Sequence, residues 1–265
     1  MERRKEIDPK EIQHIIDEIK RYFIENGNEK TKAVIGISGG KDSTIAAALL
    51  VRALGKENVI GVMMPQDSQS DIADSIEVCN ILGIRRFTIN IGSACSALYG
   101  AIDEGYDYDH NCKNIPAVGT NVPARMRMNT LYAVAAIVGG RVINTGNKSE
   151  LYVGYTTKYG DLAGDFAILK DYCVREVLEI GDNLEELPYH LVHKAPGDGM
   201  TGLTDEDNMG FSYDVLDSYL LDGIIPDYDT WRKIQERHKR NIHKNDIRIP
   251  YIRKLTRSLK EDLIF

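Results

Sequence analysis

The sequence has 265 residues, which is enough for one large domain with a substantial hydrophobic core. Hydrophobic residues make up 43% and charged residues 28% of it, as in an ordinary globular protein. The formal net charge of -7 disfavours broad nucleic-acid binding, and no apolar run is long enough to span a bilayer. Residues 1–7 are mostly charged and lack the apolar core of a secretory signal.

The number and spacing of the cysteines bear on metal sites, disulfides and the cellular compartment. The four cysteines are scattered without any C-x-x-C pair: Cys79, Cys95, Cys112 and Cys173. This spacing argues against a zinc site, an iron–sulfur site and a disulfide framework. We therefore expect a protein of the reducing cytoplasm that binds neither membranes nor nucleic acids.

The first predicted element is an amphipathic helix. Asp8 suits its N-cap, Pro9 its first turn, and Glu11 the reciprocal carboxylate of the cap. Gly27 is typical of a helix end. One face of this helix carries apolar side chains at helical spacing, namely Ile12, Ile15, Ile16, Ile19 and Phe23.

Strands and helices alternate along the next part of the chain. The pattern predicts strands at 33–37, 59–64, 86–91 and 141–144, and helices at 45–51, 71–82, 94–102 and 121–138. Such alternation is typical of a three-layer α/β/α fold with a mostly parallel central sheet. Ligands of these sheets bind beyond the carboxyl ends of the strands, where Ser38, Pro65 and Thr145 would lie.

The last third of the chain lacks this alternation of strands and helices. Long loops are predicted at 155–165 and 193–204, a helix capped by Thr204 follows, and another helix covers 229–239. There is no internal repeat, low-complexity tract or linker, so residues 1–265 are expected to form a single domain.

A glycine-rich turn between the first strand and the next helix is the most informative motif. Residues 33–44 have the sequence AVIGISGGKDST. A strand, a glycine turn and a helix start together form a nest of backbone N–H groups that suits phosphate. The motif is neither a Walker A loop, because Asp42 follows Gly40-Lys41, nor a G-x-G-x-x-G fingerprint. The alternative is an ordinary helix start with a glycine turn.

Asp42 is the telling residue of this motif. A carboxylate beside phosphates repels them unless a divalent cation lies between, so Asp42 implies Mg²⁺. The hexapeptide SGGKDS resembles the pyrophosphate loop of enzymes that cleave ATP between its α and β phosphates.

A second cluster, NTGNKSELYVGYTTKYGD at 144–161, follows the fourth predicted strand. Together with the loop at 36–43 it resembles the ammonia-dependent NAD⁺ synthetase family, as do residues 121–128 and 236–240. The resemblance covers residues 10–245 in the same order. It implies an adenine nucleotide alpha-hydrolase-like, Rossmann-like fold, and ATP-dependent amidation of nicotinic acid adenine dinucleotide (deamido-NAD⁺) by ammonia. An adenylated intermediate would give NAD⁺, AMP and pyrophosphate.

The resemblance also assigns residues to ATP and metal. Asp42 and Glu150 would ligate Mg²⁺, and both are expected to take part in catalysis. The residues expected to contact ATP are Gly36, Ile37, Ser38, Gly39, Gly40, Lys41, Asp42, Ser43 and Thr145. From the residues alone, Glu150 is also compatible with a solvated helix-start carboxylate, and Thr145 with a simple cap.

Further residues match positions that hold the dinucleotide in the family, namely Arg125, Lys158, Asp165, His238 and Lys239. In isolation Arg125 is better explained as a surface charge, and a basic helix end is the commoner explanation of His238-Lys239. Asp161 is the candidate for receiving ammonium and accepting its proton, the third catalytic position. By analogy with the family, we also expect a homodimer with substrate bound near the interface.

The chain departs from the family pattern at two positions. Val174 stands where a lysine that touches ATP phosphate is expected, and Lys170 or Arg175 is a candidate replacement. Gly197 stands where the family has threonine or serine, and backbone N–H groups or Asp198 through water are candidates to compensate.

Two other kinds of protein could carry the same loop. Another pyrophosphate-loop ligase, such as a tRNA-thiolating or purine-amidating enzyme, would share the loop, but the absence of paired cysteines and the acidic balance disfavour the first. The segment YTTKYGD disfavours both. A nucleotide-binding sensor without turnover would belong to another class. The chain has no room for a glutaminase domain, so the ammonia is expected to be free or delivered by a partner.

Overall fold

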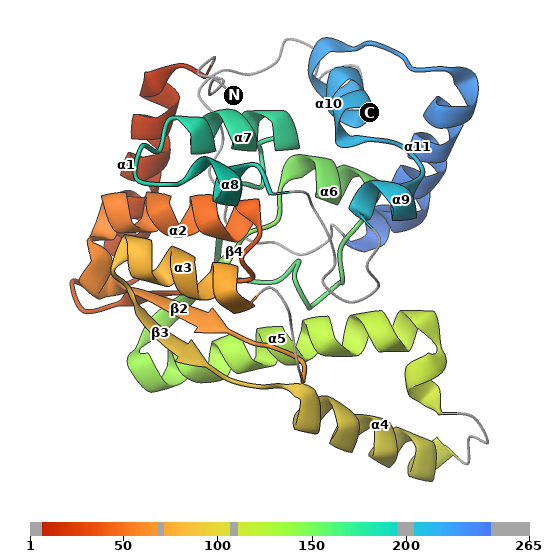
Figure 1. Cartoon of the computed structure of the whole chain (residues 1–265), viewed down its shortest axis with the longest axis horizontal. Helices are drawn as coiled ribbons and strands as arrows, with labels where there is room; N and C mark the ends of the chain where they lie inside the picture. Colours follow the sequence, from red (N-terminus) through yellow and green to blue (C-terminus); the bar gives the residue numbers. More distant parts are fainter. Residues whose placement is uncertain (1–6, 68–71, 107–110, 195–203, 245–265) are drawn as a thin grey trace.

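A five-stranded parallel sheet organises the computed structural model, which describes residues 7–67, 72–106, 111–194 and 204–244 (Figure 1). Its strand order is β3-β2-β1-β4-β5, and every neighbouring pair is parallel. The strands are β1 (Lys32–Gly36), β2 (Val59–Met63), β3 (Arg85–Thr88), β4 (Gly140–Asn144) and β5 (Phe166–Ala167). This confirms the predicted α/β class.

Apolar residues cover both faces of the sheet, as a parallel sheet requires. Along β1, Ala33 and Ile35 belong to one core and Val34 to the other. The first core packs against α1 (Pro9–Glu25), α2 (Lys41–Leu54), α3 (Ile72–Leu82), α7 (Val174–Asp182) and α8 (Tyr189–Val192). The second core packs against α5 (Pro116–Val138). The sheet is thus the middle of three layers.

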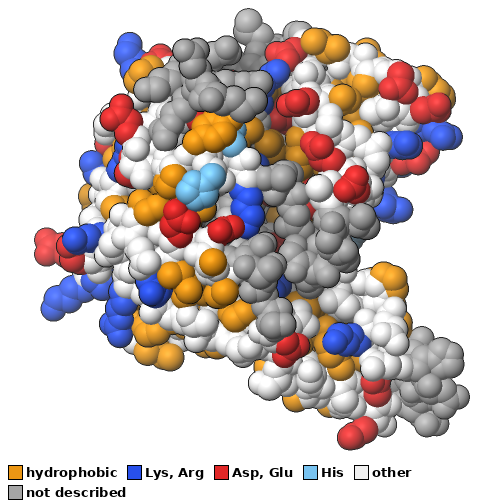
Figure 2. Space-filling view, viewed as in Figure 1, with side chains coloured by type: hydrophobic (Ala, Val, Ile, Leu, Met, Phe, Trp, Pro, Cys, Tyr) orange, Lys and Arg blue, Asp and Glu red, His pale blue; other side chains and the backbone are white. Residues whose placement is uncertain are grey.

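Helix α4 (Gly92–Tyr106) forms an arm rather than part of the sheet cover. It packs against α5 and the short 3₁₀ helix η2 (Cys112–Asn114) through Cys95 and Tyr99, together with Ile91 just before the helix. The space-filling view shows the arm standing away from the body, with a notch between it and the helices near the carboxyl end of the chain (Figure 2).

The remaining helices form a second cluster beside the carboxyl edge of the sheet. They are α6 (Lys148–Val153), α9 (Asp205–Met209), α10 (Tyr213–Asp222) and α11 (Tyr228–Asn241). The 3₁₀ helix η3 (Ile242–Lys244) follows α11 directly. Val153, Val174, Tyr213, Leu216 and Ile234 pack together in its centre. Another 3₁₀ helix, η1 (Lys56–Asn58), precedes β2. Within the described ranges, no helix is long and apolar enough to cross a membrane.

The order of the strands predicts a crevice at the carboxyl ends of β1 and β4. The chain moves from β1 to β2 on one side, while β4 pairs with β1 on the other side. At such a reversal the loops that leave the two central strands diverge and open a binding crevice. The loop after β1 and residues 145–147 after β4 therefore flank the same crevice.

Several predicted boundaries shift in the structure. Helix α5 begins at Pro116 rather than at 121, because Pro116 suits the first turn of a helix, and Pro123 therefore lies inside the helix. The third strand ends at Thr88 rather than at 91, although Ile89 and Ile91 still donate backbone hydrogen bonds to Met63 and Pro65. Helices α7 and α10 and the two-residue strand β5 were not predicted.

The first helix differs from prediction at Glu11. Asp8 caps the helix by accepting a hydrogen bond from the Lys10 backbone N–H, as expected of an N-cap. Glu11, expected to reciprocate this cap, is only 2% exposed. Its Oε1 accepts a hydrogen bond from the buried Tyr172 hydroxyl at 2.7 Å. This contact ties α1 to the segment that precedes α7.

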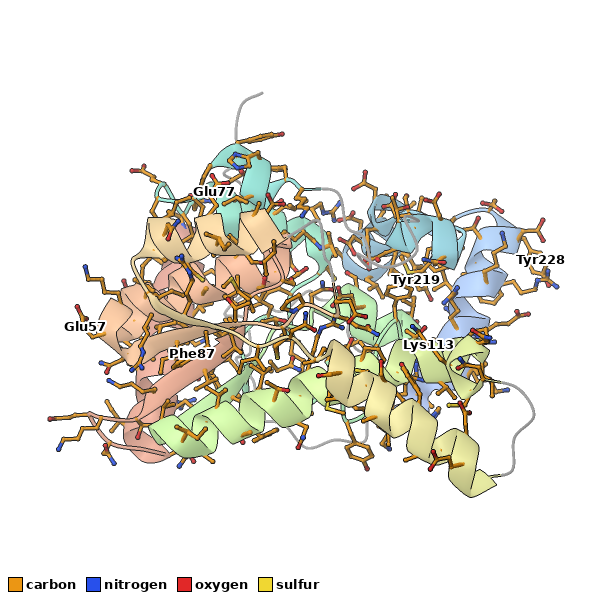
Figure 3. All side chains as sticks on the ribbon, turned by 60° about the horizontal axis from the view of Figure 1, so that its bottom comes forward. Glu57, Glu77, Phe87, Lys113, Tyr219 and Tyr228 are labelled. Carbon is orange, nitrogen blue, oxygen red and sulfur yellow. The ribbon has the colours of Figure 1, made fainter. Side chains whose placement is uncertain are left out.

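We expect Tyr172→Phe to lower the free energy of unfolding by about 1–3 kcal/mol, because it leaves a buried carboxylate without this donor. Urea unfolding followed by circular dichroism measures the change. The control is Tyr228→Phe, since Tyr228 is 72% exposed at the outer edge of the molecule (Figure 3). Equal stability of the two variants would contradict the assigned role of the Glu11–Tyr172 contact.

Candidate active site

The loop after β1 forms a tight turn at the start of a long helix. Gly39 has φ 77°, a left-handed conformation that favours glycine, and Gly40 is the N-cap of α2. The Ser38 and Ser43 hydroxyls lie 3.1 Å apart. The Gly40 N–H donates to Ser38 Oγ, and Ser43 Oγ donates to the Gly40 carbonyl. The turn therefore presents hydroxyls and backbone N–H groups at the positive end of a helix, which suits an anion.

Asp42 occupies the first turn of α2 and has a partner on each oxygen. Its Oδ2 accepts a hydrogen bond from Lys41 Nζ at 2.8 Å, and its Oδ1 accepts one from Asn147 Nδ2 at 3.1 Å. Burial alone would lower the pKa of Lys41, but the carboxylates of Asp42 and Glu150 outweigh it and raise the pKa. Lys41 is therefore a firmly charged cation inside the site.

Glu150 reaches the same place from the other strand. Asn147 caps α6 in a reciprocal capping box: its Oδ1 accepts from the Glu150 N–H, and Glu150 Oε2 accepts from the Asn147 N–H. Burial and then the charge of Asp42 raise the pKa of Glu150 above its usual range, while Lys41 opposes them. The structure thus brings Asp42 and Glu150 together, with Asn147 contacting both.

This pair fits a hard divalent cation. Two carboxylates that repel each other are stabilised by a cation between them, and oxygen ligands are those that Mg²⁺ prefers. Across the described ranges, no group of three metal-ligating side chains is found. Phosphate oxygens and water would therefore supply the other ligands of a Mg²⁺ ion held by Asp42 and Glu150.

Residues 144–146 connect the fourth strand to the loop that carries Asp161. Asn144 Nδ2 donates to the carbonyls of Asp161 and Ala163 at 2.7 and 2.9 Å, and its Oδ1 accepts from the Gly146 N–H. Thr145 lies between these two residues, directly after β4, and is half-buried. The position is compatible with the predicted contact to ATP.

Asp161 is open to solvent but closely surrounded by protein. Its Oδ1 accepts from the Thr157 N–H at 2.6 Å. The surrounding protein atoms reduce the hydration of the carboxylate and raise the pKa of Asp161 to about 6. Backbone hydrogen bonds and the charge of Lys244 oppose this shift. The charge of Asp161 also raises the pKa of Glu150, so the two carboxylates lie within electrostatic range of each other.

Four predicted substrate residues lie on three segments: Arg125 on α5, Lys158 in the loop after α6, and His238 and Lys239 on α11. Arg125 Nε donates to the Lys158 carbonyl at 3.1 Å, and Lys158 Nζ donates to the His243 carbonyl. The His238 ring stacks on Tyr152 with 4.1 Å between the ring centroids. Lys239 is exposed on α11. The structure therefore gathers Arg125 and Lys158, and ties His238 to the helix that carries Glu150.

Asp165 lies apart from Arg125 and Lys158. Its Oδ2 accepts from the Val142 N–H at 2.7 Å, and its Oδ1 accepts from the Tyr132 hydroxyl. It lines a hollow of about 780 Å³ with Tyr22 and Arg141. Because Thr31 and Gly140 also line it, the hollow opens beside the amino ends of the strands, away from the phosphate loop.

The structure adds residues that sequence reasoning missed. The Lys41 ammonium lies 5.7 Å from the ring centroid of Tyr213, whose hydroxyl is 3.4 Å from Asp205 Oδ2. Burial raises the pKa of Asp205, and the charge of Lys41 opposes this. No local signal announces Tyr213 or Asp205, because they are far from the loop in sequence. Asn147, by contrast, was detectable from the N-x-x-E capping pattern at 147–150.

The two departures from the family pattern have different outcomes. Val174 is buried and its N–H donates to Ser149 Oγ. The Arg175 guanidinium binds Asp222 of α10 at 2.7 Å, so its charge is already paired, whereas Lys170 is half-buried and burial lowers its pKa. Gly197 and Asp198 lie outside the described residues.

The fold and the loop define a nucleotide-binding α/β protein of the pyrophosphate-loop class. Residues 11–252 match the NAD synthase family. An NH₃-dependent NAD⁺ synthetase of Pyrococcus furiosus is 39% identical over 194 residues, which are 73% of this chain and 72% of that protein.

Solved structures agree with this match. An NMN synthetase of Francisella tularensis has a TM-score of 0.81 at 32% identity, covering 92% of this chain and 98% of that one. An NH₃-dependent NAD synthetase of Campylobacter jejuni has a TM-score of 0.70 at 28% identity, covering 91% and 98%. The chain belongs to the NAD synthase family, whose members are ligases that form a C–N bond.

We expect Glu150→Gln to lower kcat/KM for ATP-dependent amidation on the order of 100-fold or more, because the charge of a carboxylate expected to hold Mg²⁺ is lost. Glutamine still completes a capping box, so the stability of the fold should change little. Steady-state kinetics and urea unfolding measure the two effects. Asp17→Asn, on the exposed face of α1, is the control. A variant that retained full activity would exclude Glu150 as a metal ligand.

Proposed function

We propose that this protein catalyses the ATP-dependent amidation of deamido-NAD⁺ by ammonia, giving NAD⁺, AMP and pyrophosphate. One observation carries the proposal: Asp42 and Glu150, from opposite sides of the crevice, meet beside a serine- and glycine-lined helix start. Membership of the NAD synthase family supports it.

The chemistry needs an activated acid. The substrate carboxylate attacks the α-phosphorus of ATP, the bond to pyrophosphate breaks, and an acyl adenylate remains. The turn at residues 38–43 would hold the departing pyrophosphate through backbone N–H groups and the hydroxyls of Ser38 and Ser43. Mg²⁺ at Asp42 and Glu150 would neutralise phosphate charge. Thr145, at the end of β4, would contact ATP from the facing side.

The second half of the reaction forms the amide. Ammonia attacks the acyl carbon, a C–N bond forms, and AMP leaves with the electron pair of the broken C–O bond. The nitrogen loses a proton, for which Asp161 is the proposed acceptor. This residue is exposed to solvent, and its charge acts on Glu150.

Substrate positioning is proposed to involve Arg125, Lys158, Asp165, His238 and Lys239. Arg125 and Lys158 supply the cations that a dianionic pyrophosphate linkage requires. Asp165 lies apart from them and lines the separate hollow near Tyr22. A homodimer, in which a second copy places its substrate against that hollow, would reconcile the two locations.

The setting of the enzyme follows from the same proposal. Residues 1–265 are proposed to act as one synthetase unit, which takes ammonia from solution or from a separate partner. All four cysteines lie in the described part of the chain, and none forms a disulfide there. This supports a reducing cytoplasmic location.

A mononucleotide substrate is a second candidate, because the Francisella tularensis protein at TM-score 0.81 is an NMN synthetase. In that case the same site would amidate nicotinic acid mononucleotide to NMN. The chemistry at Asp42, Glu150 and Asp161 would be unchanged, and only the recognition of the distal nucleotide would differ.

Product analysis decides between these candidates. With Mg-ATP and ammonium, we expect AMP, pyrophosphate and NAD⁺ from deamido-NAD⁺, at a higher kcat/KM than NMN from the mononucleotide. Liquid chromatography of the products measures both. A higher kcat/KM with the mononucleotide would favour the second candidate. ATP binding without any product would favour a sensor, and accumulation of ADP instead of AMP would exclude both reactions.

The pH dependence tests Asp161. Its pKa is raised to about 6, so its carboxylate is present above that pH and is lost as the pH falls through it. At a fixed concentration of free ammonia, kcat/KM should fall about tenfold per pH unit below pH 6. Asp161→Asn should lower the rate and remove this acid limb. An unchanged limb in the variant would show that another group titrates.

A further inference from the structure

Lys41 is a charged side chain in an unusual place. It is only 5% exposed, although lysine is almost never fully buried without a partner. Its ammonium lies 2.8 Å from Asp42 Oδ2 and above the ring of Tyr213. The charges of Glu150 and Asp205 also act on it. One internal cation therefore serves three carboxylates that come from three different segments.

This cation competes directly with a divalent metal for Asp42. Asp42 Oδ1 accepts from Asn147 and Oδ2 from Lys41, so a metal that binds Asp42 shares an oxygen with the Asn147 amide or with the Lys41 ammonium. Asn147 also caps α6, which fixes it in place, whereas the Lys41 side chain is long and rotatable. A positive charge that stays at 2.8 Å from Oδ2 would repel an incoming dication strongly.

We propose that Lys41 is the resident counter-cation of the Asp42–Glu150 pair, holding the two carboxylates together and keeping a divalent metal weakly bound until a triphosphate arrives. Phosphate oxygens then give Lys41 new acceptors at the loop in which it already lies. The Lys41 ammonium would then move from Asp42 Oδ2 to the phosphate oxygens, which would leave Oδ2 available to hold the metal. Lys41 is in this sense a positioning residue that couples metal binding to nucleotide binding.

The coupling has a thermodynamic consequence. Because coupling is reciprocal, whatever makes the metal bind better when the triphosphate is present makes the triphosphate bind better when the metal is present. Metal would therefore enter chiefly together with ATP. The inference rests on the proposed use of Mg²⁺ and ATP at this site, but its test does not require turnover.

The test measures Mn²⁺ binding without nucleotide, by the loss of the free Mn²⁺ electron paramagnetic resonance signal. Removing the charge in Lys41→Met should tighten Mn²⁺ binding about tenfold or more, because the competing cation is gone. Lys41→Arg keeps the charge and should bind as weakly as the unaltered protein. The double variant Lys41→Met with Asp42→Asn should lose the gain, which would locate it at this pair.

A matched control uses a distant lysine. Lys56 is exposed in η1 and precedes Glu57, which lies on the opposite side of the molecule from α11 (Figure 3). Lys56→Met should bind Mn²⁺ like the unaltered protein. A gain of affinity in Lys41→Met is informative because structural damage would weaken metal binding, not strengthen it.

Two results would overturn the inference. The first is Mn²⁺ affinity in Lys41→Met that equals or falls below that of the unaltered protein. The second needs no variant and covers the case in which Lys41→Met fails to fold: micromolar Mn²⁺ binding by the unaltered protein without nucleotide. Either result can occur while the amidation assay still yields NAD⁺, so failure here is distinguishable from failure of the proposed function.

Discussion

The amide of Asn147 is the contact on which the rest of the site depends. Its Nδ2 donates to Asp42, while its Oδ1 and backbone N–H complete the cap that holds Glu150. One side chain thereby joins the helix after β1 to the helix after β4. The two carboxylates, on the helices that follow different strands, repel each other, so their approach needs this fixed contact as well as the charge of Lys41. The parallel sheet brings the two helices near each other, and Asn147 fixes the position of one carboxylate relative to the other.

The charges of the site are balanced inside the protein. Lys41 compensates Asp42 and Glu150, and the ring of Tyr213 and the carboxylate of Asp205 complete its surroundings. A buried charge without such partners would be costly. The loop that is proposed to receive phosphate therefore carries a cation already in place, which favours an anionic ligand and disfavours an isolated metal ion.

Local patterns were sufficient to predict the alternating core of the fold. The strands at 33–37 and 59–64 were visible because strands buried on both faces are uninterrupted apolar runs. Helix α7 escaped because its N-cap is Cys173, which gives no start signal, and β5 because it has two residues. In the site, the motifs located Asp42 and Glu150, but contacts of Lys41 with Tyr213 and Asp205 depend on distant segments. Likewise, the spacing of residues along the sequence could not show that Asp165 lies in a hollow away from the phosphate loop.

The attachment of α6 to the later helices has a consequence for how the molecule is made. Ser149, next to Glu150, donates to the buried Asp217 of α10, which also accepts the Arg175 backbone N–H. During synthesis the glycine turn after β1 leaves the ribosome long before Asp217 does. A nascent chain can thus shape its anion-binding turn early, yet it anchors the helix of Glu150 only when most of its length has emerged.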